Sequence, residues 1–128
     1  MPGFPPLATL ATGPEGPGWD GHSWSPWLPI GEASSSAGSV VGLYRIRGIA
    51  DGGLLYVGQG KIAHRPRSHV RKVRRVGDRQ GEVFAAAPLE ATGVAGEWLA
   101  HQRLELEVDL IATHLLATGR IPAAQFLG

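Results

Sequence analysis

The chain has 128 residues, of which 43% are hydrophobic and 18% charged, as expected for a soluble globular protein with one domain. It contains no cysteine and no long apolar run, which excludes disulfides, thiolate metal sites and a membrane span, so we expect a cytoplasmic protein without a membrane partner. The net charge of +1 conceals a basic segment at residues 61–79. This asymmetry predicts a polyanionic partner; the alternative is a solvated basic helix.

Residues 1–38 are rich in proline, glycine and serine, a composition that disfavours regular structure. We interpret them as an N-terminal extension of a domain that spans residues 39–128. Trp19, Trp24 and Trp27 are costly to leave exposed, so we expect this arm to pack on the core. The alternative is that its indole rings stack on the bases of a bound nucleic acid.

Residues 40–47 alternate as in a half-buried strand, with Leu43 on one side and Tyr44 on the other. The turn sequence GIADGG follows, and residues 54–57 predict the second strand of a β-hairpin.

Farther along the chain, residues 62–76 place apolar side chains three and four positions apart, which predicts an amphipathic helix with a basic face. Residues 81–88 predict a third strand and residues 90–96 a loop. Residues 97–118 predict a long helix that ends at Gly119. The fold class is therefore α/β of the α+β type: a small, three-stranded, mainly antiparallel sheet flanked by helices.

One acidic residue of the long helix lies in an apolar stripe. Glu107 has Leu104, Leu110 and Ile111 at the positions that are its neighbours on a helix surface. Because an unpaired carboxylate is costly to bury, Glu107 should have a partner: a base, a hydrogen-bond donor or a metal ion. The structural alternative is a salt bridge to an arginine such as Arg103.

Two tripeptides of the predicted hairpin, Gly42-Leu43-Tyr44 and Tyr56-Val57-Gly58, resemble the namesake tripeptides of the GIY-YIG nuclease superfamily. The resemblance extends over roughly residues 39–128. In that family an arginine and, four residues later, a histidine or tyrosine follow on the next helix; RPRSH provides Arg65 and His69.

The family closes with a glutamate followed by an apolar pair, and EVDLI matches this pattern through Glu107 rather than Glu105. The position of the family arginine has one alternative. Pro66 follows Arg65 and disfavours helical geometry there, so Arg67 is the second candidate.

The resemblance implies a metal-dependent endonuclease that hydrolyses phosphodiester bonds in DNA, with RNA as the alternative substrate. Glu107 would hold Mg²⁺ or Mn²⁺, and Arg65 would clamp the phosphate. Tyr44 would orient or deprotonate the attacking water, while Tyr56 or His69 would assist. Which tyrosine acts as the base stays open.

The side chains expected to contact the nucleic acid are Gln59, Lys61, Arg67, Arg71, Arg74 and Arg75. Cleavage of both strands by one active site would suggest a homodimer. Two alternatives remain at this point: a catalytically inactive nucleic-acid-binding module and a protein-interaction domain on the same fold.

Overall fold

The computed structural model describes residues 13–37, 40–49, 53–62, 64–71, 77–85 and 88–127. For residues 34–37, 67, 69 and 70 only the backbone is described. None of the helices in the described part of the chain combines the length and the apolarity needed to cross a bilayer.

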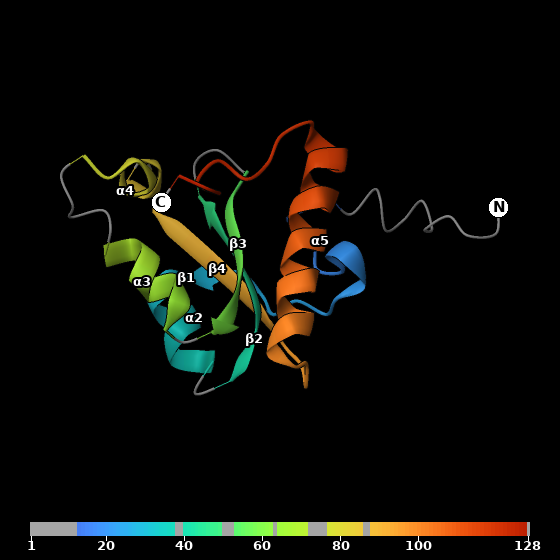
Figure 1. The fold of residues 1–128 in the computed structure, drawn as a ribbon. Helices are drawn as coiled ribbons and strands as arrows, with labels where there is room; N and C mark the ends of the chain where they lie inside the picture. The colour runs from blue at the N-terminus through green and yellow to red at the C-terminus, as the bar shows by residue number, and fades with distance from the viewer. Residues whose placement is uncertain are drawn as a thin grey trace.

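The described residues form an α+β fold around a four-stranded antiparallel sheet with the strand order β1-β4-β2-β3 (Figure 1). The strands are β1 (Leu28–Pro29), β2 (Val41–Gly48), β3 (Leu54–Lys61) and β4 (Leu89–Ala95). The predicted hairpin is confirmed as β2 and β3. The expected number of three strands is wrong, because the N-terminal arm adds β1 at one edge.

The segment predicted as the third strand is instead the helix α4 (Arg79–Ala85). The Asp78 carboxylate accepts a hydrogen bond from the Gly81 amide at 2.8 Å, which caps the first turn. Gln80 and Phe84, four residues apart, are both buried, as expected for one face of a helix rather than for alternating strand positions.

The segment predicted as a loop is instead β4. Its Gly93 does not form a turn: a Cβ atom there would lie 2.9 Å from the Ile62 side chain, so the glycine allows this side chain to pack directly on the strand. The glycine in this strand is therefore explained by close packing of a neighbouring side chain and not by a turn.

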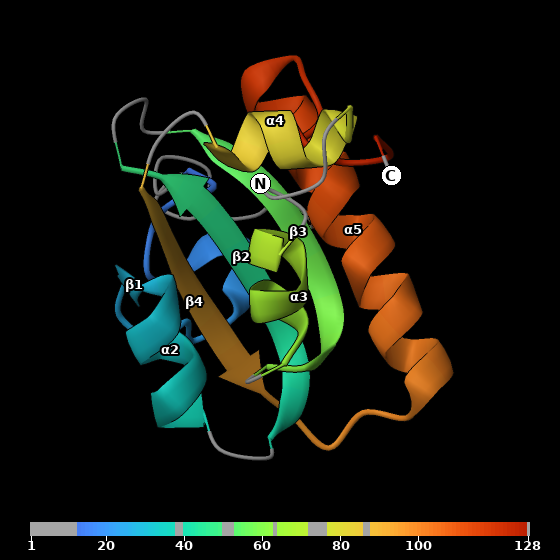
Figure 2. The same ribbon diagram turned by 90° about the vertical axis from the view of Figure 1, so that its left-hand side faces the viewer.

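The remaining helices are α2 (Ile30–Ala37), α3 (Arg65–Arg71) and α5 (Ala100–Thr118). Helices α2, α3 and α4 lie on one side of the sheet, and α5 runs along β3 on the other side (Figures 1 and 2). The predicted end of the long helix is confirmed, because Gly119 adopts a left-handed conformation with φ of 80°. Of the predicted basic helix, residues 72–76 lie outside the described residues.

The tryptophan arm packs on the core, as expected. Trp19 and Trp24 are buried in a cluster with Leu43, Val57 and Leu110, on the side of the sheet that α5 covers. A second cluster, on the opposite face of the sheet, contains Tyr44, Ile46 and Phe84. The two clusters therefore bury both faces of the β2–β3 hairpin.

Candidate active site

Tyr44 and Tyr56 come together on one face of the hairpin. Tyr44 pairs with Gly58 across the strands, and Ile46 pairs with Tyr56, so the two tyrosines are diagonal neighbours. Their ring centroids lie 6.1 Å apart with the planes at 20°. Tyr44 is 0% exposed, whereas Tyr56 is half-buried. Of the two phenols, Tyr56 is therefore the one that a substrate can reach.

The glycines beside the tyrosines make room for the site. A Cβ atom on Gly58 would lie 2.4 Å from the Tyr44 hydroxyl oxygen, so this phenol lies directly over a position without a side chain. Gly60 has φ of +129° and faces the Arg65 side chain, whose Cγ would lie 3.1 Å from an added Cβ. Both glycines allow site side chains to lie close to the β3 backbone.

Arg65 is the first residue of α3, and Pro66 occupies the first turn, where proline is tolerated because its missing amide hydrogen would have no partner in the helix. The exposed Arg65 side chain hydrogen-bonds to the Tyr44 hydroxyl, and its positive charge acts on Tyr56 and Glu107 as well. Arg65 therefore interacts with each of the three other candidate residues, Tyr44, Tyr56 and Glu107. The side chain of the alternative, Arg67, lies outside the described residues.

Glu107 completes this arrangement from α5. It is half-buried, and its negative charge acts on both Tyr44 and Tyr56. Burial raises the pKa of the Glu107 carboxyl, and the nearby Arg65 charge opposes this shift. Within the described part of the chain, the carboxylate makes no ion pair and accepts no hydrogen bond.

The salt bridge between Glu107 and Arg103 that we considered as the structural alternative does not form. Instead, the Arg103 Nε donates to the Gln59 side-chain Oε1 at 3.0 Å, and its Nη1 donates to the Trp98 backbone carbonyl at 2.9 Å. Arg103 thus fixes the start of α5 to β3, one helical turn before Glu107. We expected the Gln59 side chain to contact nucleic acid; in the structure it accepts the hydrogen bond from Arg103.

Both phenols are neutral at physiological pH. Burial is the main cause that raises the pKa of Tyr44, and the neighbouring Tyr56 adds to it, against the lowering effect of Arg65. Burial also raises the pKa of Tyr56, and the Glu107 charge adds to this, while a hydrogen bond with Tyr44 opposes it. A neutral phenol can both donate and accept hydrogen bonds.

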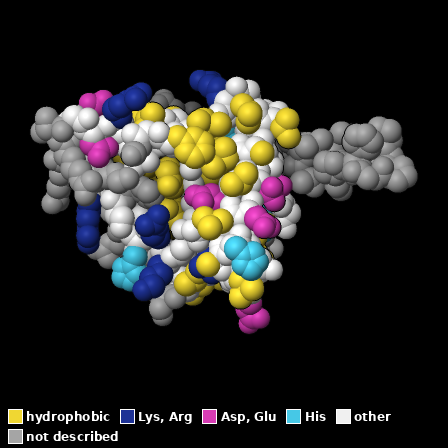
Figure 3. All heavy atoms as spheres, in the orientation of Figure 1, with side chains coloured by type: hydrophobic (Ala, Val, Ile, Leu, Met, Phe, Trp, Pro, Cys, Tyr) yellow, Lys and Arg dark blue, Asp and Glu magenta, His cyan; other side chains and the backbone are white. Residues whose placement is uncertain are grey.

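The other predicted site residues are less fully described. The backbone of His69 lies one turn after Arg65 on α3, and its side chain lies outside the described residues, as do Arg74 and Arg75 entirely. Lys61 and Arg71 are exposed. Figure 3 shows Lys and Arg side chains toward the α3 side of the face, whereas acidic side chains follow α5. Arg65, at the start of α3, connects this side of the molecule with the tyrosine site through its contact with Tyr44.

Sequence reasoning did not identify Gln125 as a residue that supports the site. Its side-chain amide accepts a hydrogen bond from the Val57 amide and donates one to the Val57 carbonyl, both at 3.0 Å. This paired contact fixes the C-terminal tail to the strand position directly after Tyr56. The signal available in the sequence was a polar residue within the apolar stretch AAQFL.

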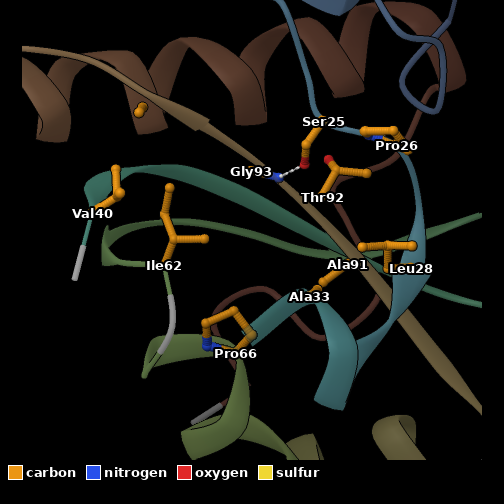
Figure 4. A pocket seen from close by; sticks show the side chains of 11 residues that line it. Ser25, Pro26, Leu28, Ala33, Val40, Ile62, Pro66, Ala91, Thr92 and Gly93 are labelled. Carbon is orange, nitrogen blue, oxygen red and sulfur yellow. Dashed lines mark hydrogen bonds between the residues drawn. The ribbon is translucent and has the colours of Figure 1, made fainter. Parts of the chain in front are cut away.

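A separate hollow of about 350 Å³ lies on the tyrosine side of the sheet, between β4, α2 and the start of α3 (Figure 4). Its lining is mostly apolar and includes Leu28, Ala33, Ala91 and Pro66, with the Ser25 hydroxyl bonded to the Gly93 amide. Neither tyrosine lines it, nor do Arg65 and Glu107. The hollow is therefore distinct from the cluster of polar side chains at β3.

The donors at Glu107 fit a hard divalent cation that keeps most of its water ligands. The described residues contain no group of three or more His, Cys, Asp or Glu side chains that could enclose an ion. One half-buried carboxylate without a protein partner suits Mg²⁺ or Mn²⁺, which take few protein ligands when phosphate oxygens complete the coordination.

We compared the chain with protein-family models, with curated proteins and with solved structures, and none of the three comparisons gave a match. The resemblance to the GIY-YIG nucleases therefore rests on the motif residues themselves and stays a prediction.

Proposed function

We propose that this protein is a metal-dependent endonuclease of the GIY-YIG type that hydrolyses phosphodiester bonds in DNA. The observation that carries the proposal is the convergence of Tyr44, Tyr56, Arg65 and Glu107, which come from two strands and two helices and act on one another electrostatically. A structural role alone does not require an exposed guanidinium, a half-exposed phenol and an unpaired carboxylate at one place.

Arg65 binds the scissile phosphate in this proposal. Its guanidinium is exposed and positively charged, and its forked donors match two phosphate oxygens. The same side chain is fixed by its contact with the Tyr44 hydroxyl, which limits the entropy lost when the phosphate binds.

Tyr56 contacts the substrate, and Tyr44 is a positioning residue. Because Tyr56 is only partly buried, its hydroxyl can orient the attacking water or a phosphoryl oxygen, whereas Tyr44 has no exposed surface. Tyr44 instead positions both neighbours through hydrogen bonds, one with Tyr56 and one with Arg65. This assignment replaces our expectation that Tyr44 orients the water.

Glu107 holds the cation. Its carboxylate is unpaired in the described part of the chain, and Arg65 keeps part of its negative charge compensated until an ion binds. When bound, Mg²⁺ or Mn²⁺ would neutralise charge on the phosphoryl oxygens and lower the pKa of a coordinated water. Glu107 would supply a carboxylate ligand to this ion.

A plasmid-nicking assay tests the proposal. Wild-type protein should nick supercoiled DNA in Mg²⁺ and not in chelator, and Glu107→Gln should lower the rate at least ~100-fold. The matched control is Glu105→Gln, which removes an exposed carboxylate from the same helix and should keep the wild-type rate. Equal rates for wild type and Glu107→Gln would remove Glu107 from the mechanism and overturn the proposal.

Binding measurements separate the alternative functions. Tight binding of DNA at low salt without any metal-dependent cleavage would support a catalytically inactive nucleic-acid-binding module. Absence of binding would leave the protein-interaction domain. If the protein cuts both strands in one encounter, its single candidate site per chain favours action as a homodimer, and the cleavage rate should then rise more steeply than linearly with protein concentration.

A further inference from the structure

Phe126, in the C-terminal tail, is an aromatic residue that the core does not use. It is 75% exposed. Its φ of +63° lies in the left-handed region, which is unusual for a residue with a bulky side chain. Backbone strain of this kind persists where surrounding contacts impose it, often at ligand sites. The exposed ring therefore needs an explanation other than core packing.

The two residues before Phe126 are bonded to β3 on either side of Tyr56. The Ala124 amide donates to the Leu55 carbonyl at 2.7 Å, and the Gln125 side chain forms both of its hydrogen bonds with Val57. Tyr56 is the residue between these two anchor points on β3. Because β3 is the edge strand of the sheet, the tail covers part of its free edge at Tyr56, and Phe126 is the next residue of this tail.

Two exposed arginines flank the tail. Arg79 begins α4, and the next residue, Gln80, donates a hydrogen bond to the Ala124 carbonyl at 2.9 Å. Arg120 is exposed where the chain leaves α5 to form the tail. In Figure 3, hydrophobic side chains gather at the end of the molecule where α5 ends, with Lys or Arg side chains near them.

An exposed aromatic ring in a tail with exposed arginines near it suits an unpaired nucleotide, because the ring can stack on the base while the arginines contact the phosphates. A base inside a continuous duplex is already stacked on its neighbours and cannot use the ring. We propose that Phe126 is a stacking platform for an unpaired nucleotide next to the scissile phosphate. This rests on the proposed nuclease function and adds a substrate class: single-stranded or branched nucleic acid.

Fluorescence anisotropy with the full chain in EDTA tests this inference without any cleavage. The probes are a labelled oligothymidylate and a labelled duplex of the same length. Phe126→Ala should weaken binding of the single strand roughly 5- to 150-fold and leave duplex binding unchanged, since one base–aromatic stack contributes about 1–3 kcal/mol. Phe126→Trp should keep the wild-type affinity. Leu116→Ala, which removes an 87%-exposed apolar side chain from α5, is the matched control and should have no effect.

Equal weakening of both probes by Phe126→Ala, or no weakening of either, would overturn the stacking platform. A change of oligomeric state in Phe126→Ala would overturn it as well, since the ring would then serve a protein contact. The nicking assay is independent of these outcomes. A protein that binds single strands through Phe126 but does not nick DNA would retain the platform and lose the proposed nuclease function.

Discussion

Arg45 lies against the tryptophan arm and Glu107 lies near the tyrosines. The two charged side chains differ in how many partners surround them. Arg45 is 1% exposed, and its charge is fully surrounded. Its Nε donates to the Thr92 hydroxyl at 2.7 Å and its Nη1 to the Pro14 carbonyl at 2.6 Å. The rings of Trp24 and Trp27 lie 4.5 and 4.7 Å from the guanidinium carbon.

Glu107 lacks such surroundings. Burial shifts the pKa of both groups, lowering that of Arg45 to about 9 and raising that of Glu107. Arg45 donates hydrogen bonds to Thr92 and Pro14 and contacts two indole rings, whereas in the described part of the chain Glu107 has only the nearby charge of Arg65. We infer that the first charge fastens the arm to the sheet and that the second is kept available for a ligand.

The largest effect on stability should follow from loss of the Arg45 side chain. Arg45→Ala should lower the free energy of unfolding by about 3 kcal/mol, because it leaves a cavity between two indole rings and removes the partners of buried polar atoms. Urea denaturation measures this. Arg47→Ala is the control: its ion pairs with Glu15 and Glu90 are partly exposed and its guanidinium lies over the Trp27 ring, so its loss should cost less, about 1 kcal/mol. Equal losses would contradict a special role for Arg45.

A smaller loss is expected on the tyrosine side from Gly58→Ala. The new methyl group would lie 2.4 Å from the Tyr44 hydroxyl, so the phenol must move, at a cost of about 1–3 kcal/mol. Because Tyr44 positions both Tyr56 and Arg65, plasmid nicking should fall as well.

Gly53→Ala provides the comparison for this variant, since a Cβ atom at Gly53 meets no atom within 4 Å. It should be neutral in both assays. A Gly58→Ala protein with wild-type stability and nicking rate would show that the contact between Gly58 and Tyr44 is not required.

The smallest expected effect on stability is the contribution of His114 to its pH dependence. This imidazole is buried near the end of α5, and its Nδ1 contacts the Arg120 carbonyl at 2.5 Å. Burial lowers the pKa of His114, so the neutral ring stabilises the fold above the pKa of the unfolded state, about 6.5. That contribution is lost as the pH falls below this value.

Urea midpoints measured between pH 7.5 and 5 should therefore decrease more for wild type than for His114→Gln, which does not titrate. Parallel curves for the two proteins would exclude His114 as a source of acid sensitivity.

Much of the candidate site could be predicted because its signals are local. Tyr44 and Tyr56 lie on an alternating hairpin, and Glu107 interrupts an apolar helix stripe, so each stands out within a few residues of sequence. That they meet at Arg65 depended on the family resemblance. The buried state of Tyr44 and the contacts of Arg103 and Gln59 could not be read from the sequence, because packing between distant elements decides them.

The fold was predicted less completely. The hairpin and the end of α5 followed from alternation and from Gly119. Residues 81–88 were predicted as a strand and form most of α4, and residues 90–96 were predicted as a loop and form most of β4, where Gly93 allows Ile62 to pack closely. β1 was missed because it has two residues, Leu28 and Pro29, which is too short for any periodic signal.

The most direct test of a charge kept available for a ligand is the stability of Glu107→Gln against wild type, in EDTA and in Mg²⁺ or Mn²⁺. A carboxyl whose pKa is raised by folding stabilises the fold only while protonated, and this contribution is lost as the pH rises through that pKa. At pH 7 in EDTA, Glu107→Gln should therefore have the higher urea midpoint, and the ion should raise the midpoint of wild type alone. A lower midpoint for Glu107→Gln in EDTA, or an equal response of both proteins to the ion, would contradict the account.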